Sequence, residues 1–176
     1  MANKQALRDL QTRLAQRLQA ARSEGVAASW LGVEIRGGKY LFPLSHSGEI
    51  FPWSTTQFVP YTQPWYLGVA NLRGGLYGVV DFASYLSGAA PAARSDMARN
   101  ESRLIALNAA LEVNCALLID RLAGLKNAAS FVDVAEPGAG APDFFGKVLT
   151  DETGAQWQEI NLQTLSAELP FLTIRA

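Results

Sequence analysis

Hydrophobic residues recur with two different periods along the chain. In residues 1–24, apolar residues are spaced three or four positions apart, which places them on one face of a helix. Basic residues and glutamines occupy most other positions, and Gly25 is a suitable stop signal. The pattern predicts an amphipathic N-terminal α-helix over residues 1–24, which packs on its own domain, binds a partner or lies on a membrane surface. Its apolar face consists of Leu7, Leu10, Leu14, Leu18 and Ala21.

Beyond Gly25, the pattern changes to alternating positions and to residues that favour strands. Two such runs, Trp30–Ile35 and Lys39–Leu44, are separated by Arg36-Gly37-Gly38. Glycines between two strands predict a hairpin, because the tight turns that match strand twist need positive φ. Short strands with turn signals between them favour a barrel or a sandwich over strand–helix–strand units. Further predicted strands cover Leu67–Asn71, Leu76–Val80, Arg103–Leu107, Val113–Ile119, Ala129–Val134, Gly146–Leu149 and Trp157–Ile160.

Two stretches of the chain, residues 68–86 and 146–165, weakly repeat one pattern. Each has a glycine, a strand, a glycine-containing turn and a second strand. Asp81 and Asn161 then follow the second strand, and both residue types are good helix N-caps because their side chains accept free backbone N–H groups. The repeat therefore predicts two small barrel lobes, each of which ends in a short helix.

The connections between these elements are visible in the composition. Residues 87–100 are small and polar, and we interpret them as the linker between the lobes of one domain over residues 25–176. Residues 135–143 are rich in Gly and Pro, which predicts a surface loop. Leu162–Leu169 predicts a short helix that ends before Pro170.

Composition and charge place the chain among globular proteins. With 176 residues, of which 49% are hydrophobic, it can bury a domain-sized core, and the composition argues against disorder. The net charge of −1 is unevenly distributed. Residues 1–24 carry five basic and two acidic side chains, a net +3, so the rest of the chain carries −4. This balance gives no electrostatic reason to bind nucleic acid, which requires many phosphate contacts.

Reactive side chains are few and scattered. His46 is the only histidine and Cys115 the only cysteine. Neither a catalytic triad with a nucleophile elbow nor a metal site with the usual ligand spacing is indicated. We interpret His46 as a surface-loop residue and Cys115, which lies in an apolar run, as a buried thiol. The sequence therefore predicts a protein that is not an enzyme and that uses no metal or other cofactor.

The sequence carries no sign of secretion or of membrane insertion. Its N-terminus lacks an apolar h-region, and no apolar run approaches the roughly 18 residues that a membrane span requires. A single cysteine excludes an intrachain disulfide and fits a reducing compartment. We therefore expect a cytoplasmic protein.

One long stretch of the chain is almost uncharged. Between Ile50 and Ala93 only Arg73 and Asp81 are charged. Arg73 is therefore expected either to be buried in an ion pair or to stand on an apolar surface that a partner covers. The pattern alone does not decide between a packing role and a binding role.

Residues 59–86 resemble the signature of the CheW family, the adaptors that join bacterial chemoreceptors to a CheA-type histidine kinase. The matching order is a proline-ended strand, an aromatic pair, Gly68-Val69-Ala70-Asn71-Leu72-Arg73-Gly74, a strand, and a short helix led by Asp81. The resemblance extends over residues 30–165, where the other matching segments follow in the family's order.

The resemblance implies two SH3-like five-stranded barrel lobes with a hydrophobic groove between them. The groove would bind the cytoplasmic tip of a methyl-accepting chemoreceptor, and a barrel edge would bind the SH3-like regulatory domain of a CheA-like kinase. Arg73 would then either contact the receptor directly or act as a structural clamp. The residues that the family assigns to the receptor-facing region are Glu49, in a segment similar to its V-x-E-I motif, and Gly68, Asn71, Arg73 and Gly74 of the signature.

Several departures from the family pattern carry information. Ser47 replaces a usual valine, Gly75 stands where a larger residue is common, and Asn161 stands where aspartate is common. With the added N-terminal helix, these features are more similar to PilI-type adaptors of type IV pilus twitching-motility systems. The resemblance therefore implies a non-enzymatic scaffold that works at membrane-bound receptor arrays and controls twitching motility. A small-molecule- or peptide-binding β-barrel module outside chemosensory signalling is the alternative.

Overall fold

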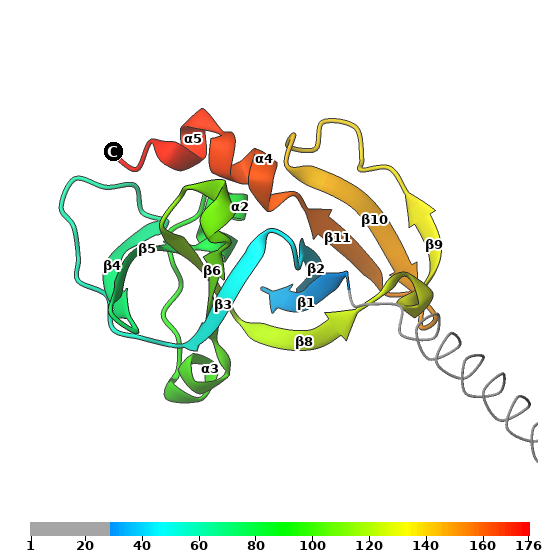
Figure 1. Cartoon of the computed structure of the whole chain (residues 1–176), viewed down its shortest axis with the longest axis horizontal. Helices are drawn as coiled ribbons and strands as arrows, with labels where there is room; N and C mark the ends of the chain where they lie inside the picture. The colour runs from blue at the N-terminus through cyan, green and yellow to red at the C-terminus, as the bar shows by residue number, and fades with distance from the viewer. Residues whose placement is uncertain (1–28) are drawn as a thin grey trace, which may run out of the picture.

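The computed structural model describes residues 29–176, and the predicted helix over residues 1–24 lies outside the described residues. The described strands form two curved sheets that lie side by side (Figure 1). The six-stranded sheet has the order β8-β1-β2-β11-β10-β9, and the five-stranded sheet has the order β3-β6-β7-β5-β4. The strands are β1 (Trp30–Ile35), β2 (Gly38–Pro43), β3 (Ser47–Pro52), β4 (Tyr66–Leu72), β5 (Gly75–Asp81), β6 (Arg103–Leu107), β7 (Cys115–Ile119), β8 (Arg121–Lys126), β9 (Phe131–Ala135), β10 (Phe145–Asp151) and β11 (Gln156–Ile160).

Short helices connect the strands and cover the place where the two sheets meet. In Figure 1, α4 and α5 run across the top of this junction, while α3 lies at the bottom of the five-stranded lobe. The helices are α2 (Phe82–Ser87), α3 (Asp96–Glu101), α4 (Leu162–Ala167) and α5 (Leu169–Leu172), with 3-10 turns η1 (Ala109–Leu111) and η2 (Ala128–Ser130).

The prediction of a mainly β protein with two small lobes is confirmed, but the lobes contain six and five strands rather than five each. The additional strand is β8, which the sequence pattern did not predict. It pairs antiparallel with β1, with Trp30 opposite Lys126 and Glu34 opposite Arg121. Its sequence has no β-branched residue and contains Gly124, so its extended form depends on this pairing rather than on local propensity.

The chain enters the two lobes in an interleaved order. Strands β1 and β2 belong to the six-stranded lobe, β3 to β7 make the entire five-stranded sheet, and β8 to β11 return to the first lobe. Two pairs of neighbours are parallel, β2 with β11 and β5 with β7, whereas all other neighbours are antiparallel. The five-stranded lobe is therefore an insertion between the second and third strands of its neighbour.

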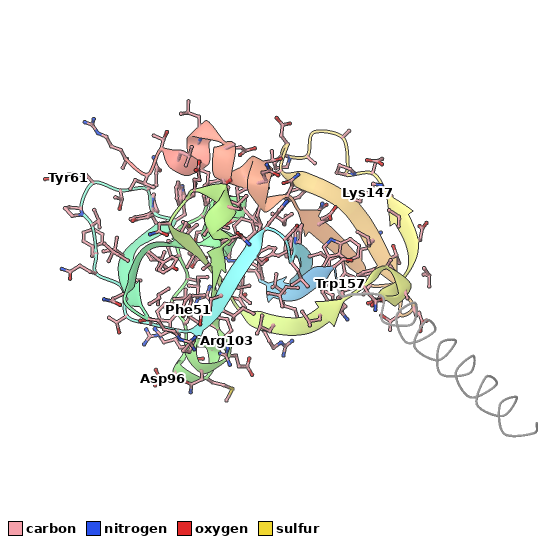
Figure 2. The ribbon with its side chains drawn as sticks, in the orientation of Figure 1. Phe51, Tyr61, Asp96, Arg103, Lys147 and Trp157 are labelled. Carbon is pink, nitrogen blue, oxygen red and sulfur yellow. The ribbon has the colours of Figure 1, made fainter. Side chains whose placement is uncertain are left out.

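The hydrophobic core consists of three clusters, which the alternation of side chains along the strands keeps apart. In β7, Leu117 and Ile119 face a large cluster shared by both lobes, while Ala116 and Leu118 face a cluster within the five-stranded lobe. All five residues of β7 are buried as a result. The third cluster lies inside the six-stranded lobe, centred on Trp157 (Figure 2). The shared cluster, which we call the interlobe core, fills the junction with residues from β1, β2, β5, β6, β7, β11 and helices α2, α4 and α5.

The two predicted helix caps are confirmed. The Asp81 side chain accepts a hydrogen bond from the Ser84 backbone N–H at the start of α2, and Asn161 accepts one from Thr164 at the start of α4. The predicted end of the second helix is wrong, because α4 ends at Ala167 and Pro170 lies in the first turn of α5. Proline is tolerated there, since the first helical N–H groups have no intrahelical acceptor.

Candidate functional site

The signature motif forms the tip of the hairpin between β4 and β5. Arg73 and Gly74 are its two turn residues, with φ of 48° and 85°. Two consecutive positive φ angles are the geometry of the tight hairpin turns that match strand twist. The Asn71 side chain closes the turn, because its Oδ1 accepts a hydrogen bond from the Gly74 N–H at 2.9 Å. Asn71 and Gly74 thus hold Arg73 at an exposed tip.

Arg73 is paired, but it is not buried. Its guanidinium donates to the carboxylate of Glu49, which lies on strand β3. The side chains are 75% and 45% exposed, respectively. The guanidinium carbon also lies 5.9 Å from the ring centroid of Phe51, which belongs to the core of the five-stranded lobe (Figure 2). Arg73 therefore forms an ion pair, as one of the two alternatives expected, but the pair lies on the surface rather than in the core.

Gly68 lies within β4, at a position with a different requirement. Its φ is 122°, and a Cβ atom there would lie 2.1 Å from the backbone oxygen of Gln57. Gln57 and Val69 exchange two backbone hydrogen bonds of 2.7 and 2.9 Å, which join the segment after β3 to β4. Gly68 thereby allows the two edges of the five-stranded sheet to meet. Of the five residues assigned by resemblance, four gather at the hairpin tip, and Gly68 shapes the barrel that carries it.

Exposed apolar side chains lie on the strands next to the residues of the ion pair. Ile50 follows Glu49 on β3 and is 37% exposed, and Leu76 lies opposite Asn71 in the β4–β5 register and is 61% exposed. We call Glu49, Ile50, Asn71, Arg73, Gly74 and Leu76 the hairpin-tip surface. It combines two opposite charges with exposed aliphatic groups, a mixture that suits contact with another protein.

The junction between the lobes is filled by the interlobe core, and hollows open at its rim. One hollow of about 620 Å³ lies between α2 and α5. It is lined by aromatic and proline residues that include Trp65, Tyr85 and Pro170. The Tyr85 hydroxyl donates to the Glu168 carboxylate at 3.4 Å. Burial, followed by the charge of Glu168, raises the pKa of Tyr85 to about 12, so this phenol stays neutral at physiological pH.

A second hollow, of about 650 Å³, lies beside a buried ionic cluster that the sequence pattern did not reveal. Arg94 comes from the predicted linker, and its side chain is 13% exposed. It contacts Asp81 at 3.5 Å, Asp120 at 2.5 Å and the Ser102 hydroxyl at 3.1 Å. Asp120 also accepts from the Arg36 backbone N–H at 2.6 Å. The cluster ties the linker to both lobes, because Arg36 follows β1 and Asp81 ends β5.

The two reactive side chains noted in the sequence lie in separate structural settings. Cys115 is buried in β7, and burial raises the pKa of its thiol to about 12. His46 lies in the turn between β2 and β3, where it is half-buried and its Nδ1 atom is enclosed. Within residues 29–176, no three His, Cys, Asp or Glu side chains are placed to hold a metal ion. None of the described helices is long and apolar enough to cross a membrane.

Comparisons with known proteins address the fold and the family. The family model described as the CheW-like domain matches residues 29–167. The crystal structure of the scaffolding protein TtCheW from Thermoanaerobacter tengcongensis is similar, with a TM-score of 0.58 and 17% sequence identity, over 74% of this chain and 86% of that chain. The expected architecture of two SH3-like lobes is thus confirmed. A search of curated proteins found no match.

Proposed function

Because the chain belongs to the CheW-like domain family, we propose that it is a non-enzymatic scaffold that joins a methyl-accepting chemoreceptor to a CheA-like histidine kinase. The family match over residues 29–167 carries this proposal, since it includes both lobes and the hairpin-tip surface. The similar solved protein is itself described as a scaffolding protein. The proposed mechanism is positional: the scaffold holds receptor and kinase in one array, so that the receptor's state biases the kinase.

The hairpin-tip surface is the proposed receptor contact. A receptor tip presents helices, and a helix-binding surface needs exposed apolar groups with a few charges that set register. Ile50 and Leu76 are the exposed apolar groups, and Arg73 and Glu49 are the charges. Arginine is enriched among interface residues whose truncation is most costly. The kinase's SH3-like regulatory domain is proposed to bind at a barrel edge.

We further propose that the pathway controls type IV pilus twitching motility. This assignment rests on the amphipathic pattern of residues 1–24 and on the departures at Ser47, Gly75 and Asn161. In a strain that lacks the chain, twitching should be lost while flagellar chemotaxis persists. Loss of flagellar chemotaxis with normal twitching would contradict the pathway and would leave the scaffold proposal standing.

A ligand-binding barrel is less well supported. In the described chain, each barrel interior is filled by its own hydrophobic cluster, one centred on Trp157 and the other containing Phe51 and Leu118. The hollow between α2 and α5 lies outside both interiors and opens to the surface. A small molecule would therefore have no enclosed barrel cavity to occupy.

Co-purification tests the scaffold directly. The full chain is mixed at tens of micromolar with a receptor's cytoplasmic tip and, separately, with the kinase's regulatory domain. Both should be retained by the wild-type protein, and the three together should form one complex on size-exclusion chromatography. If neither partner is retained, the scaffold proposal fails.

Replacement of Arg73 tests the proposed receptor surface. Arg73→Ala should weaken receptor binding about 30-fold, which corresponds to about 2 kcal/mol, when measured by calorimetry. Its free energy of unfolding should change by less than about 1 kcal/mol, because exposed ion pairs contribute little to stability. Arg99→Ala is the matched control, since Arg99 is another exposed arginine with an acidic neighbour. Unchanged receptor binding would refute the contact, and a large loss of stability would support the structural clamp.

A further inference from the structure

Strand β9 presents an apolar surface at the outer edge of the six-stranded sheet. Among the described strands it pairs with β10 alone (Figure 1). Val132 and Val134 are 65% and 53% exposed, and they lie on one face of the strand because they are two residues apart. Glu136, two positions after Val134, is exposed and continues this face, whereas Asp133 is exposed on the opposite face of the strand. An unpaired edge with exposed valines is a site for further association. We call Val132, Val134 and Glu136 the β9 surface.

The charge of this part of the molecule is one-sided. Residues 127–174 contain seven acidic residues and one basic residue, a net charge of −6. Residues 29–176 as a whole contain ten basic and fourteen acidic residues. The described residues outside 127–174 are therefore close to neutral. A partner of the β9 surface should therefore offer an apolar stripe flanked by basic groups. Residues 1–24 have this pattern, with a leucine stripe and a net charge of +3.

The point where the N-terminal segment joins the fold brings it close to β9. The Ser29 N–H donates to the Lys126 carbonyl at 2.8 Å, immediately before the chain enters η2 and β9. The rings of Trp30 and Phe131, the first residue of β9, lie 6.0 Å apart. A tether of residues 25–28 extends to at most about 14 Å. Such a short tether gives the segment a high effective concentration at the β9 surface.

We propose that residues 1–24 bind the β9 surface of the same chain as an amphipathic helix. Leucines of the stripe would cover Val132 and Val134, and basic residues beside the stripe would face Glu136. The five-residue strand measures about 16 Å, so it would be covered by three turns of a helix whose 24 residues extend about 36 Å. This contact shields the sheet edge from other strands. It does not depend on the receptor and kinase proposals.

Disulfide cross-linking in the full chain tests the contact. The double variant Leu10→Cys with Val134→Cys should form an intramolecular disulfide at least about tenfold faster than Leu10→Cys with Leu76→Cys. Leu76 is the matched control, since it is similarly exposed but lies in the other lobe. The native Cys115 is buried and will not compete. Products are separated by size without reductant.

Each outcome of this experiment decides the proposal. A fast cross-link within the monomer supports it. A cross-linked dimer overturns it in favour of a second copy at the β9 surface, and equal rates for the two double variants overturn it as well. The charge argument is tested by adding Glu136→Lys, which should slow the monomer cross-link at least about fivefold. The same reversal at Glu101, on α3, should have no effect.

Discussion

Arg36 and Arg73 occupy equivalent turns but have different surroundings. Each has a positive φ of 48° and precedes a glycine in the turn of a hairpin. Arg36 is tied to its own molecule, because its backbone N–H donates to Asp120 and its guanidinium donates to the Ser87 hydroxyl at 3.1 Å. Within residues 29–176, the side chain of Arg73 interacts with the exposed Glu49 and with the face of Phe51. The same local geometry thus anchors one turn and exposes the other.

Backbone geometry makes Gly68 far less replaceable than other glycines. Gly68→Ala should lower the free energy of unfolding by about 3 kcal/mol or more, because its Cβ would clash with the Gln57 oxygen at a disfavoured φ. Gly37→Ala is the control, since Gly37 has φ of 77° with open space around it and should cost about 1 kcal/mol. Urea denaturation measures both. Equal losses would show that strain alone, and not the approach of Gln57, explains the glycine.

Asp151 should contribute to the acid sensitivity of the fold. Hydrogen bonds from Thr153 and from the Trp157 indole hold the pKa of Asp151 well below its ordinary value of 3.8. A depressed folded-state pKa stabilises the protein above the unfolded-state pKa, and this stabilisation is lost as the pH falls through the folded-state value. The melting temperatures of wild type and Asp151→Asn should therefore converge as the pH is lowered below about 4. A constant difference from pH 7 to pH 2 would contradict this role.

At the scale of the element, residues 87–100 are more ordered than their composition indicated. They contain all but the last residue of α3, whose N-terminus is capped by the Ser95 side chain. No residue of α3 is buried, so the segment is held by polar contacts rather than by an apolar face. Arg94 provides these contacts through Asp81, Asp120 and Ser102.

Loss of Arg94 should release this segment. Arg94→Met should lower the free energy of unfolding by about 2–3 kcal/mol, because the buried Asp81 carboxylate would lose its charged partner. Hydrogen exchange should also become faster in α3. Arg99→Met, on the exposed side of the same helix, should change stability by less than about 0.5 kcal/mol. Similar effects of the two variants would show that the cluster does not hold the linker.

The success of sequence-based prediction differs between elements for physical reasons. Strands with strong alternation and helix caps such as Asp81 were predicted, because period and capping are local properties. Strand β8 was missed, since its pairing with β1 is a tertiary interaction. The family resemblance located Arg73 and Glu49, but their ion pair joins positions 24 residues apart and follows no local rule. The Arg94 cluster was missed for the same reason.

At the scale of the whole molecule, the hydrophobic cluster that the two lobes share is larger than the cluster within either lobe. The interlobe core draws residues from both sheets and from three helices. Side chains on opposite faces of one strand, such as Leu117 and Leu118, therefore belong to different clusters. A substitution that loosens the packing of either cluster should therefore also loosen β7, which both clusters share.

Unfolding should consequently be a single transition. Circular dichroism and tryptophan fluorescence should give coincident urea midpoints, because neither lobe keeps its core when the other unfolds. Leu117→Ala in the interlobe core and Leu118→Ala within the five-stranded lobe should each lower stability by about 2–5 kcal/mol. Both variants should retain coincident midpoints. Separate midpoints in Leu118→Ala would indicate that the lobes unfold independently.

The interleaved order of the strands also has a consequence during protein synthesis. All five strands of the five-stranded sheet lie between residues 47 and 119, so this lobe can complete its sheet while translation continues. The β1–β2 hairpin must wait with an unpaired edge until β11 leaves the ribosome more than 110 residues later. At elongation rates of about 5–20 residues per second, this wait lasts on the order of ten seconds. The nascent chain therefore exposes its first hairpin to chaperones throughout that interval.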